Sequence, residues 1–173
     1  IGLGALNDPQ LIQEIAVATA REVAATGIDW TFAPTLAQAK DYRWGRTYES
    51  YSDDPDLVEA YGRAMVEGIE GEGLAATAKH FIGDGGTTAG RDQGNTELST
   101  ADLLAQHGSG YTGAFDAAVD TVMATFNSVN GVKVHGSKSL LTDVLREQLG
   151  FDGMVISDWN GVGQVQGLSL IHI

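Results

Sequence analysis

Hydrophobic residues along the chain occur in two alternating patterns, one with helical spacing and one of short uninterrupted runs. The first helically spaced group follows Asn7-Asp8-Pro9, ends before Gly27, and consists of Leu11, Ile12, Ile15, Ala16, Thr19 and Val23. An acidic cap, a proline in the first turn and a terminal glycine, together with this spacing, are typical of an α-helix. The same signals predict a second helix that follows Asp53-Asp54-Pro55 and ends at residues 71–73.

Two more helices and four strands complete the predicted elements. Ser99-Thr100-Ala101-Asp102 resembles a capping box and opens a third helix, which we expect to be interrupted around residues 108–113 and to resume over residues 114–119. Residues 137–149 form the predicted fourth helix. Short apolar runs predict strands over residues 28–33, 74–81, 122–126 and 154–156. Consecutive apolar residues in the last run, Met154 to Ile156, are typical of a strand buried on both faces of a parallel sheet.

The repeated order of helix, glycine stop, apolar strand and polar loop predicts an α/β fold with a parallel sheet. Periodicity alone leaves open an open doubly wound sheet or about half of a (β/α)8 barrel. Polar clusters follow every predicted strand, at residues 35–52, 79–95, 127–131 and 157–163, which favours loops around one central site. A dinucleotide-binding sheet would need a G-x-G-x-x-G run directly after a strand, and no predicted strand is followed by one. We therefore predict a partial (β/α)8 TIM-like barrel, truncated at both ends.

The composition of the chain restricts the kinds of molecule that we expect it to bind. The chain has 173 residues, 43% hydrophobic and 19% charged, which suits a single globular domain. A formal net charge of −13 argues against nucleic acid and anionic membranes as partners, and no apolar run approaches the roughly 20 residues of a membrane helix. The absence of cysteine excludes thiolate chemistry. No pair of histidines has the spacing of metal ligands, so we expect no metal site.

The two ends of the sequence look unlike the ends of a natural domain. The first residues, Ile1-Gly2-Leu3-Gly4, lack the basic and apolar regions of a signal peptide. Residues 168–173, Leu-Ser-Leu-Ile-His-Ile, resemble the translation of a sequencing adapter. We expect this segment to be a non-native tail and the natural sequence to end near Gly167.

Three groups of residues are candidates for chemistry. Asp158 ends a predicted buried strand, where a carboxylate is costly unless it is paired or functional; a helix cap or a structural ion pair is the alternative. Lys79 and His80 lie at the end of the strand over residues 74–81 and could donate to hydroxyl groups. Both reach one ligand only if the strand has already turned into its loop, because adjacent strand residues face opposite ways.

Charged side chains alternate with aromatic rings in the loop over residues 35–52. Bidentate arginine donors beside ring faces suit a sugar, which has hydroxyls at its edge and C–H groups on its faces, so Arg43 and Arg46 are candidates. The alternative is that Arg43 and Glu49 form an ion pair that holds the loop. The run Gly83-Asp84-Gly85-Gly86 lacks the lysine of a Walker motif, and we interpret it as a tight loop that carries His80 into place.

Four motifs resemble, in order and spacing, the N-terminal barrel domain of glycoside hydrolase family 3, over residues 1–167 as a central portion of that domain. They are Phe32-Ala33-Pro34, the run from Arg43-Trp44-Gly45-Arg46 to Tyr51, the run from Ala78-Lys79-His80 to Gly86, and Val155-Ile156-Ser157-Asp158-Trp159. Together with Asp92-Gln93-Gly94-Asn95, they look closest to the bacterial β-glucosidases and exo-β-glucanases of the family.

This resemblance implies a retaining exo-hydrolase of terminal β-D-glucosyl residues, with β-glucosides or β-glucan oligosaccharides as substrates and no cofactor. The resemblance implies that Asp158 is the nucleophile. It also implies that Arg46, Lys79 and His80 bind the sugar hydroxyls and that Trp159 lines the site. The acid/base is expected from a C-terminal α/β domain that this chain lacks, so the chain alone is expected to be inactive. The family also favours a periplasmic or secreted location.

The sugar preference and the function itself both have alternatives. Gln93, Phe126 and Asn160 differ from some relatives and bear on which sugar is preferred. A carbohydrate-binding or inactive fragment would use the same contacts without turnover. A Schiff-base aldolase through Lys79, with His80 as base, is a further possibility that has no use for Asp158.

Overall fold

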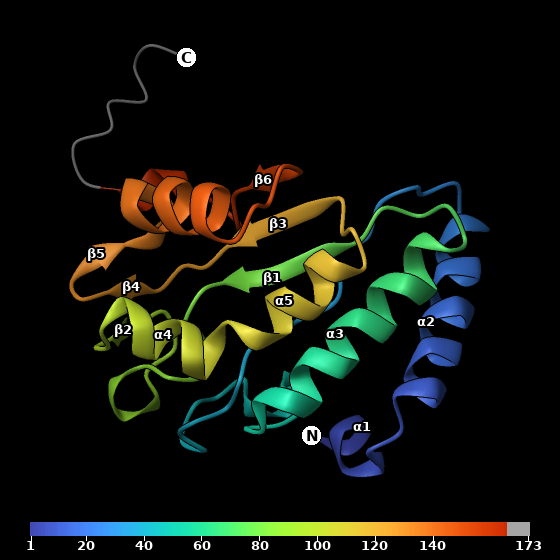
Figure 1. Cartoon of the computed structure of the whole chain (residues 1–173), viewed down its shortest axis with the longest axis horizontal. Coiled ribbons are helices and arrows are strands. Elements are labelled where there is room, and N and C mark those ends of the chain that lie inside the picture. Colours follow the sequence, from blue (N-terminus) through green and yellow to red (C-terminus); the bar gives the residue numbers. More distant parts are fainter. Residues whose placement is uncertain (166–173) are drawn as a thin grey trace.

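The computed structural model describes residues 1–165, and the predicted tail over residues 168–173 lies outside them. Its central sheet has three parallel strands in the order β1-β3-β6, namely β1 Thr77–Phe81, β3 Thr121–Ala124 and β6 Met154–Ile156. Figure 1 shows these strands side by side, each separated in sequence from the next by helices. The predicted α/β class and parallel sheet are confirmed, and parallel strands place all their carboxyl ends at one edge.

The helices are α1 Gly2–Leu6, α2 Pro9–Ala24, α3 Pro55–Glu70, α4 Thr100–His107, α5 Ser109–Asp116 and η4 Ser139–Gln148. The capping signals correctly predict where α2, α3 and α4 begin, whereas α1 was not predicted. Asp8 Oδ1 accepts from the Leu11 N–H at 3.1 Å, and Ser99 Oγ accepts from the Asp102 N–H at 3.1 Å. These caps satisfy backbone donors that a helix start leaves free.

The expected interruption is present at Gly108, where α4 ends, but it does not extend to residue 113. The next helix, α5, begins at once at Ser109 and ends at Asp116 instead of covering residues 114–119. Tyr111 and Ala114 of α5 are buried in the main hydrophobic cluster, next to α3. This packing outweighs the low helix propensity of the glycines in the segment.

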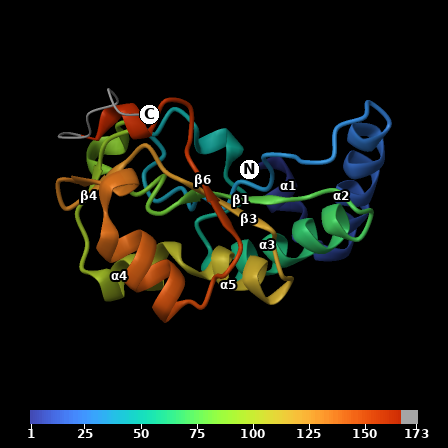
Figure 2. The ribbon, with the colours of Figure 1, turned by 90° about the horizontal axis from the view of Figure 1, so that it is seen from above.

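Helices cover one face of the sheet. In Figure 2, α3 and α5 lie on one side of β1 and β3, while the chain between α2 and α3 crosses on the other side. The buried cluster joins Ile12 of α2, Val58 and Ile69 of α3, Val122 of β3 and Leu145 of η4. Burial of each such aliphatic side chain stabilises the fold by about 1.5–3 kcal/mol, so this cluster holds the successive units together.

The predicted strand over residues 28–33 is extended but is not a regular strand. It pairs with the chain at β1 through the isolated parallel bridge Trp30↔Ala75, with a second bridge, Thr35↔Lys79, just beyond it, and the Thr77 N–H donates to the Ala33 carbonyl at 2.8 Å. Pro34 interrupts the ladder because it has no N–H to donate, although its carbonyl accepts from the Lys79 N–H at 3.1 Å. The segment still brings the following loop to the carboxyl end of β1.

Strand β6 is more exposed than predicted. Met154 is 49% exposed, although a strand buried on both faces was expected. Within residues 1–165, β6 pairs only with β3 and forms an edge of the sheet, so one of its sides has no neighbour. The apolar run is therefore a correct signal for a strand and a wrong one for its burial in this structure.

A second small sheet was not anticipated. It consists of β2 Asn95–Thr96, β4 Ser128–Val129 and β5 Val132–Lys133, with β4 and β5 antiparallel. Asn130 and Gly131 form the two-residue turn, and both have positive φ (49° and 83°). Asn-Gly is the residue pair that such hairpin turns favour, so the signal was present in the sequence. Within residues 1–165, none of the helices is long and apolar enough to cross a bilayer.

We predict that His107 makes stability depend on pH. The residue is 2% exposed, and its two ring nitrogens have no hydrogen-bond partner among residues 1–165. Burial, with a smaller contribution from Lys40 and opposed by Asp84, lowers its pKa to about 4. The unfolded chain, with a histidine pKa near 6.5, then binds the proton more readily, so stability present above pH 6.5 is lost as the pH falls toward 4, by roughly 3 kcal/mol.

Denaturant unfolding between pH 4 and pH 8 measures this effect. His107→Leu removes the titrating group while keeping an apolar side chain, and its unfolding free energy should fall less steeply on the acid side. An identical pH dependence in the two proteins would contradict the assignment.

Candidate active site

Polar side chains gather at the carboxyl edge of the central sheet, in the place the sequence predicts. His80 comes from the end of β1, Thr125 directly follows β3, and Asp158 follows β6. Together with Arg46, Asp84 and Asn127 they line a small hollow. The parallel strands bring these residues together, because loops after neighbouring strands meet at the same edge.

His80 lies at the centre of this cluster and is 5% exposed. Its Nε2 lies 3.7 Å from Asp158 Oδ2 and 3.4 Å from Arg46 Nη2. Its Nδ1 lies 2.7 Å from Asp84 Oδ2, although the oxygen is off the direction of a ring N–H, so the contact is electrostatic rather than a well-aligned hydrogen bond. The imidazole thus separates two carboxylates.

A bulge in β1 explains how Lys79 and His80 can serve one site. Lys79 is opposite Met123 and Phe81 is opposite Ala124, which leaves His80 as an extra residue in the ladder. Such bulges re-aim side chains at strand ends. Burial lowers the pKa of Lys79, Arg46 lowers it further, and Glu49, Asp158 and Asp84 oppose the shift. Lys79 therefore lies within the field of the same charged groups.

Arg46 is held by a bidentate ion pair with Glu49. Its Nε and Nη2 donate to the two carboxylate oxygens at 2.8 and 2.9 Å. The bond to Arg46 lowers the pKa of Glu49, and the same bond raises the pKa of Arg46. The alternative pairing of Arg43 with Glu49 is wrong: Arg43 is exposed and pairs with Asp41 at 2.6 Å. The pair with Glu49 fixes the guanidinium beside His80.

Asp158 and Trp159 differ in their surroundings. The Asp158 side chain is 16% exposed, and its Oδ1 accepts from the Trp159 N–H at 2.6 Å. The Trp159 residue is 88% exposed and is not among the residues that line the hollow. The structure therefore brings Arg46, His80 and Asp158 together at the hollow. Lys79 is near enough to influence these groups by its charge but does not line the hollow, and neither does Trp159.

Asp84 is the main residue of the site that the sequence did not assign. Its buried Oδ1 accepts from the Thr125 hydroxyl and from Asn127 Nδ2 at 3.3 Å, while Oδ2 faces His80. Thr125 Oγ1 in turn accepts from the Asn127 N–H at 3.1 Å. The predicted tight loop over residues 83–86 does hold Asp84 next to His80, but its partners lie more than 40 residues away in sequence.

The arrangement combines one accessible carboxylate with several fixed donors. Asp158 can act as a nucleophile or charge stabiliser, while Arg46, Lys79 and His80 can donate to ligand hydroxyls. Asp92 also lines the hollow, is exposed, and accepts from Trp44 Nε1 at 3.2 Å. No cluster of three or more potential metal-ligating side chains occurs in the described part of the chain.

Comparison with known proteins shows which family has this arrangement of residues. The family described as "Glycosyl hydrolase family 3 N terminal domain" matches residues 1–169. The chain belongs to glycoside hydrolase family 3. The partial barrel expected from the sequence is thereby confirmed as the fold class.

Curated and solved relatives agree with this membership. The chain is 38% identical over 174 residues to a β-xylosidase of Formosa agariphila, in a match that covers 95% of this chain and 24% of the relative. The crystal structure of an exo-1,3/1,4-β-glucanase from a Pseudoalteromonas species matches with a TM-score of 0.94 and 57% identity, over 95% of this chain and 22% of that one. A Listeria innocua β-glucosidase structure with isofagomine has a TM-score of 0.90 and 37% identity, over 93% and 24%.

These family 3 relatives are much longer than the matched region. The chain spans 24% of the β-xylosidase and 22% of the exo-glucanase.

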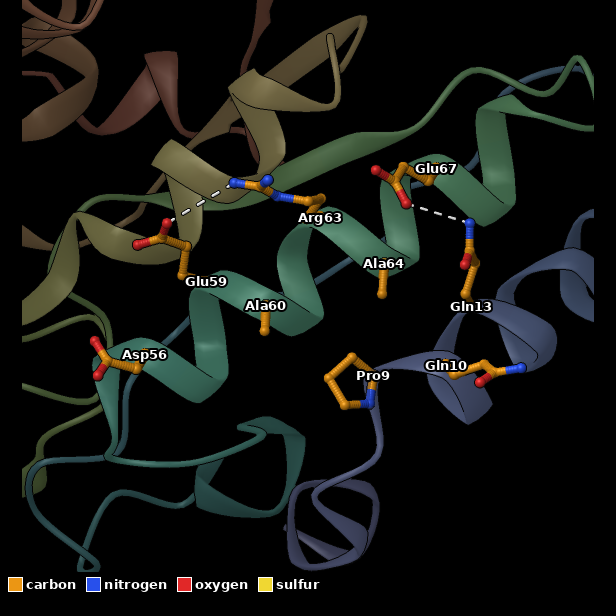
Figure 3. Close-up of a pocket in the computed structure, with 9 residues that line it drawn as sticks. All are labelled: Pro9, Gln10, Gln13, Asp56, Glu59, Ala60, Arg63, Ala64 and Glu67. Atoms are coloured by element: carbon orange, nitrogen blue, oxygen red, sulfur yellow. Dashed lines mark hydrogen bonds and ion pairs between the residues drawn. The ribbon is translucent and has the colours of Figure 1, made fainter.

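A larger hollow lies elsewhere, in the helical layer. It is a groove between α2 and α3, lined by Pro9, Gln10, Gln13, Asp56, Glu59, Ala60, Arg63, Ala64 and Glu67 (Figure 3). Gln13 Nε2 donates to Glu67 Oε2 at 3.2 Å across it, and Arg63 lies 3.9 Å from Glu59 along α3. It shares no residue with the family 3 cluster at the strand ends.

We predict that Asp84→Asn destabilises the fold. The change removes the charge that Thr125, Asn127 and His80 surround in a buried position, and it turns part of an acceptor into a donor, at an expected cost of about 2 kcal/mol. Asp92→Asn is the matched control, because its exposed carboxylate lines the same hollow and should change stability by less than about 0.5 kcal/mol. Urea unfolding measures both, and equal effects would contradict a special role for Asp84.

Proposed function

We propose that the complete protein hydrolyses terminal, non-reducing β-D-glucosyl residues with retention of configuration. The observation that carries the proposal is the Asp158 carboxylate, which lies among His80, Arg46 and Lys79 at the carboxyl edge of the sheet. Further support comes from relatives named β-glucosidase and exo-1,3/1,4-β-glucanase. Structures of the Listeria innocua relative contain glucose and gluconolactone.

In this mechanism Asp158 attacks the anomeric carbon of the terminal sugar. The glycosidic C–O bond breaks as an acid protonates the departing oxygen, and a covalent glycosyl ester forms on Asp158. Water, deprotonated by the same acid in its basic form, then releases the sugar and restores the carboxylate. Arg46, Lys79 and His80 would hold the sugar hydroxyls, and the exposed ring of Trp159 would cover a sugar face.

The acid/base residue is proposed to come from a downstream α/β domain of the longer protein. A retaining mechanism places its two carboxyl groups about 5–5.5 Å apart. Asp84 is already surrounded by His80, Thr125 and Asn127, and its role is better explained as a partner of His80. The short span of the chain on its relatives supports a contribution from outside residues 1–165.

Glucose is the proposed sugar, and xylose is the nearest competitor. The 57% identity with an exo-1,3/1,4-β-glucanase favours glucose, while a named β-xylosidase is 38% identical. The two sugars differ by a hydroxymethyl group. The residues that line the hollow would determine whether this group fits. Gln93 and Phe126 line the hollow beside Arg46 and are candidates for this discrimination.

Two other functions account for less of the structure. A carbohydrate-binding role without turnover is the proposal for the 173-residue chain on its own. Arg46 and His80 line the hollow, and we assign no second catalytic carboxyl within residues 1–165. A Schiff-base aldolase would use the lowered pKa of Lys79, but it gives no role to Asp158 or to the Arg46–Glu49 pair.

Covalent labelling tests the nucleophile. The complete gene product is incubated with a 2-deoxy-2-fluoro-β-glucoside, which forms a long-lived glycosyl-enzyme, and the labelled peptide is mapped by mass spectrometry. We expect the label on Asp158 and a loss of at least about 1,000-fold in kcat for Asp158→Asn, since covalent catalysis is lost.

Asp152→Asn is the matched control, because Asp152 is an exposed aspartate shortly before the same strand. Its activity should equal that of the unmodified enzyme. Label on another residue, in an enzyme that turns over aryl β-glucosides, would refute Asp158 as nucleophile. Preference for aryl β-xylosides would move the proposal to that sugar.

A further inference from the structure

The backbone of Asp158 is held by a histidine from another strand unit. The Asp158 N–H donates to His135 Nε2 at 3.2 Å, across 23 residues of sequence. His135 lies on the short helix η3 Val134–Gly136, directly after the β4–β5 hairpin. Its position follows from the hairpin rather than from the strand that carries Asp158.

We propose that His135 is a positioning residue for the nucleophile: its neutral imidazole accepts the Asp158 N–H and fixes the peptide from which the carboxylate projects. This inference rests on the proposed function of Asp158. His135 touches neither the reacting carbon nor the sugar in this proposal, and it acts only through the backbone of Asp158.

The hydrogen bond determines which nitrogen carries the proton. Nε2 can accept only when it has no hydrogen, so the neutral ring must carry its proton on Nδ1. The Thr125 backbone raises the pKa of His135, so it lies beside the imidazole. The Thr125 side chain donates to the buried Asp84 carboxylate. The His135 ring therefore connects the chain after β3, which binds Asp84, with the chain after β6, which carries Asp158.

Close packing holds the imidazole against the Asp158 turn. The Gly161 N–H donates to the Asp158 carbonyl at 2.9 Å and closes this turn. A Cβ placed on Gly161 would overlap Nε2 and Cε1 of His135, so only glycine allows the turn to pass this close to the ring. The Phe126 ring lies 6.2 Å from the imidazole, centroid to centroid.

The hairpin in turn fixes His135. Lys133 Nζ donates to the Phe126 carbonyl at 2.7 Å, and the Val134 N–H donates to the Asn127 carbonyl at 3.1 Å. At the turn, the Gly131 N–H donates to Asn95 Oδ1 at 2.8 Å. These bonds tie the element that carries His135 to the loops after β1 and β3.

Burial of the His135 ring favours its neutral form. Burial is the main cause that lowers the pKa of His135, and Lys133 lowers it further, while the Thr125 backbone bond and the Asp158 charge oppose the shift. Protonation would place a hydrogen on Nε2, opposite the Asp158 N–H, and remove the acceptor. Positioning should therefore be intact at neutral pH and weaken as the pH falls through the lowered pKa.

Loss of this contact should affect the chemical step more than substrate binding. The sugar hydroxyls are assigned to Arg46, Lys79 and His80, which do not depend on the Asp158 backbone, whereas attack needs the carboxylate at the anomeric carbon. A misplacement of about 1 Å can cost about 100-fold in rate. We expect His135→Ala in the complete gene product to lower kcat by roughly 10- to 100-fold on an aryl β-glucoside, with KM changed less than about 3-fold.

A conservative variant separates positioning from a structural role. In His135→Gln the amide oxygen can replace Nε2 as acceptor and does not titrate, so kcat should recover at least in part and the acid-side decline due to His135 should disappear. Gly161→Ala should lower kcat as His135→Ala does, because its methyl group displaces the ring. His107→Leu, which removes a buried histidine outside the site, is the control and should leave kcat at neutral pH unchanged.

Amide exchange gives a readout that does not depend on activity. In the unmodified protein the Asp158 N–H should exchange slowly with solvent, faster in His135→Ala, and slowly again in His135→Gln. If the unmodified enzyme hydrolyses no glycoside, the proposed function fails, and the exchange data still decide whether His135 holds the Asp158 peptide. A folded His135→Ala variant with unchanged kcat, pH profile and Asp158 exchange would overturn the inference.

Discussion

Compensation of the buried Asp84 carboxylate is the constraint on which the rest of the site depends. An ionised carboxylate removed from water is tolerated only when donors or opposite charges surround it. Asp84 obtains donors from the chain after β3, through Thr125 and Asn127, and its other oxygen lies 2.7 Å from His80 Nδ1 at the end of β1. The need to satisfy one buried acid therefore fixes two neighbouring loops relative to each other. The same network extends to the proposed nucleophile, because His80 faces Asp84 with Nδ1 and Asp158 with Nε2.

Local signals were sufficient for most of the fold. The caps at Asp8, Asp54 and Ser99 predicted helix starts correctly because a cap depends on residues within one turn. Errors arose where tertiary packing decides, as in α5, which continues through a glycine-rich segment because Tyr111 is buried against its neighbours. The exposure of β6 could not be read from its apolar run, because burial depends on which strands lie beside it.

The site was predictable in position but not in its contacts. Strand ends followed by polar residues pointed to Asp158, Lys79 and His80, and the structure places them together. The ion partner of Glu49 was not predictable, because either arginine of the loop could reach it in an extended chain. Two other residues, Asp84 and His135, were missed because their roles depend on partners from other strands. An aspartate in a glycine-rich loop or a histidine after a hairpin has no local mark of function.

The site contains several carboxylates, and nearby cationic side chains offset their charge although the chain as a whole is acidic. The sequence has a formal net charge of −13, yet Glu49, Asp84 and Asp158 lie close to Arg46 and Lys79. A neutral sugar gains little from long-range attraction, so these cations are not needed to recruit it. Their effect is at short range: Arg46 and Lys79 offset the carboxylates among which they lie, and in the proposed function they would bind sugar hydroxyls in fixed directions. Removal of either cation would therefore disturb the position of the carboxylates as well as the binding of the sugar.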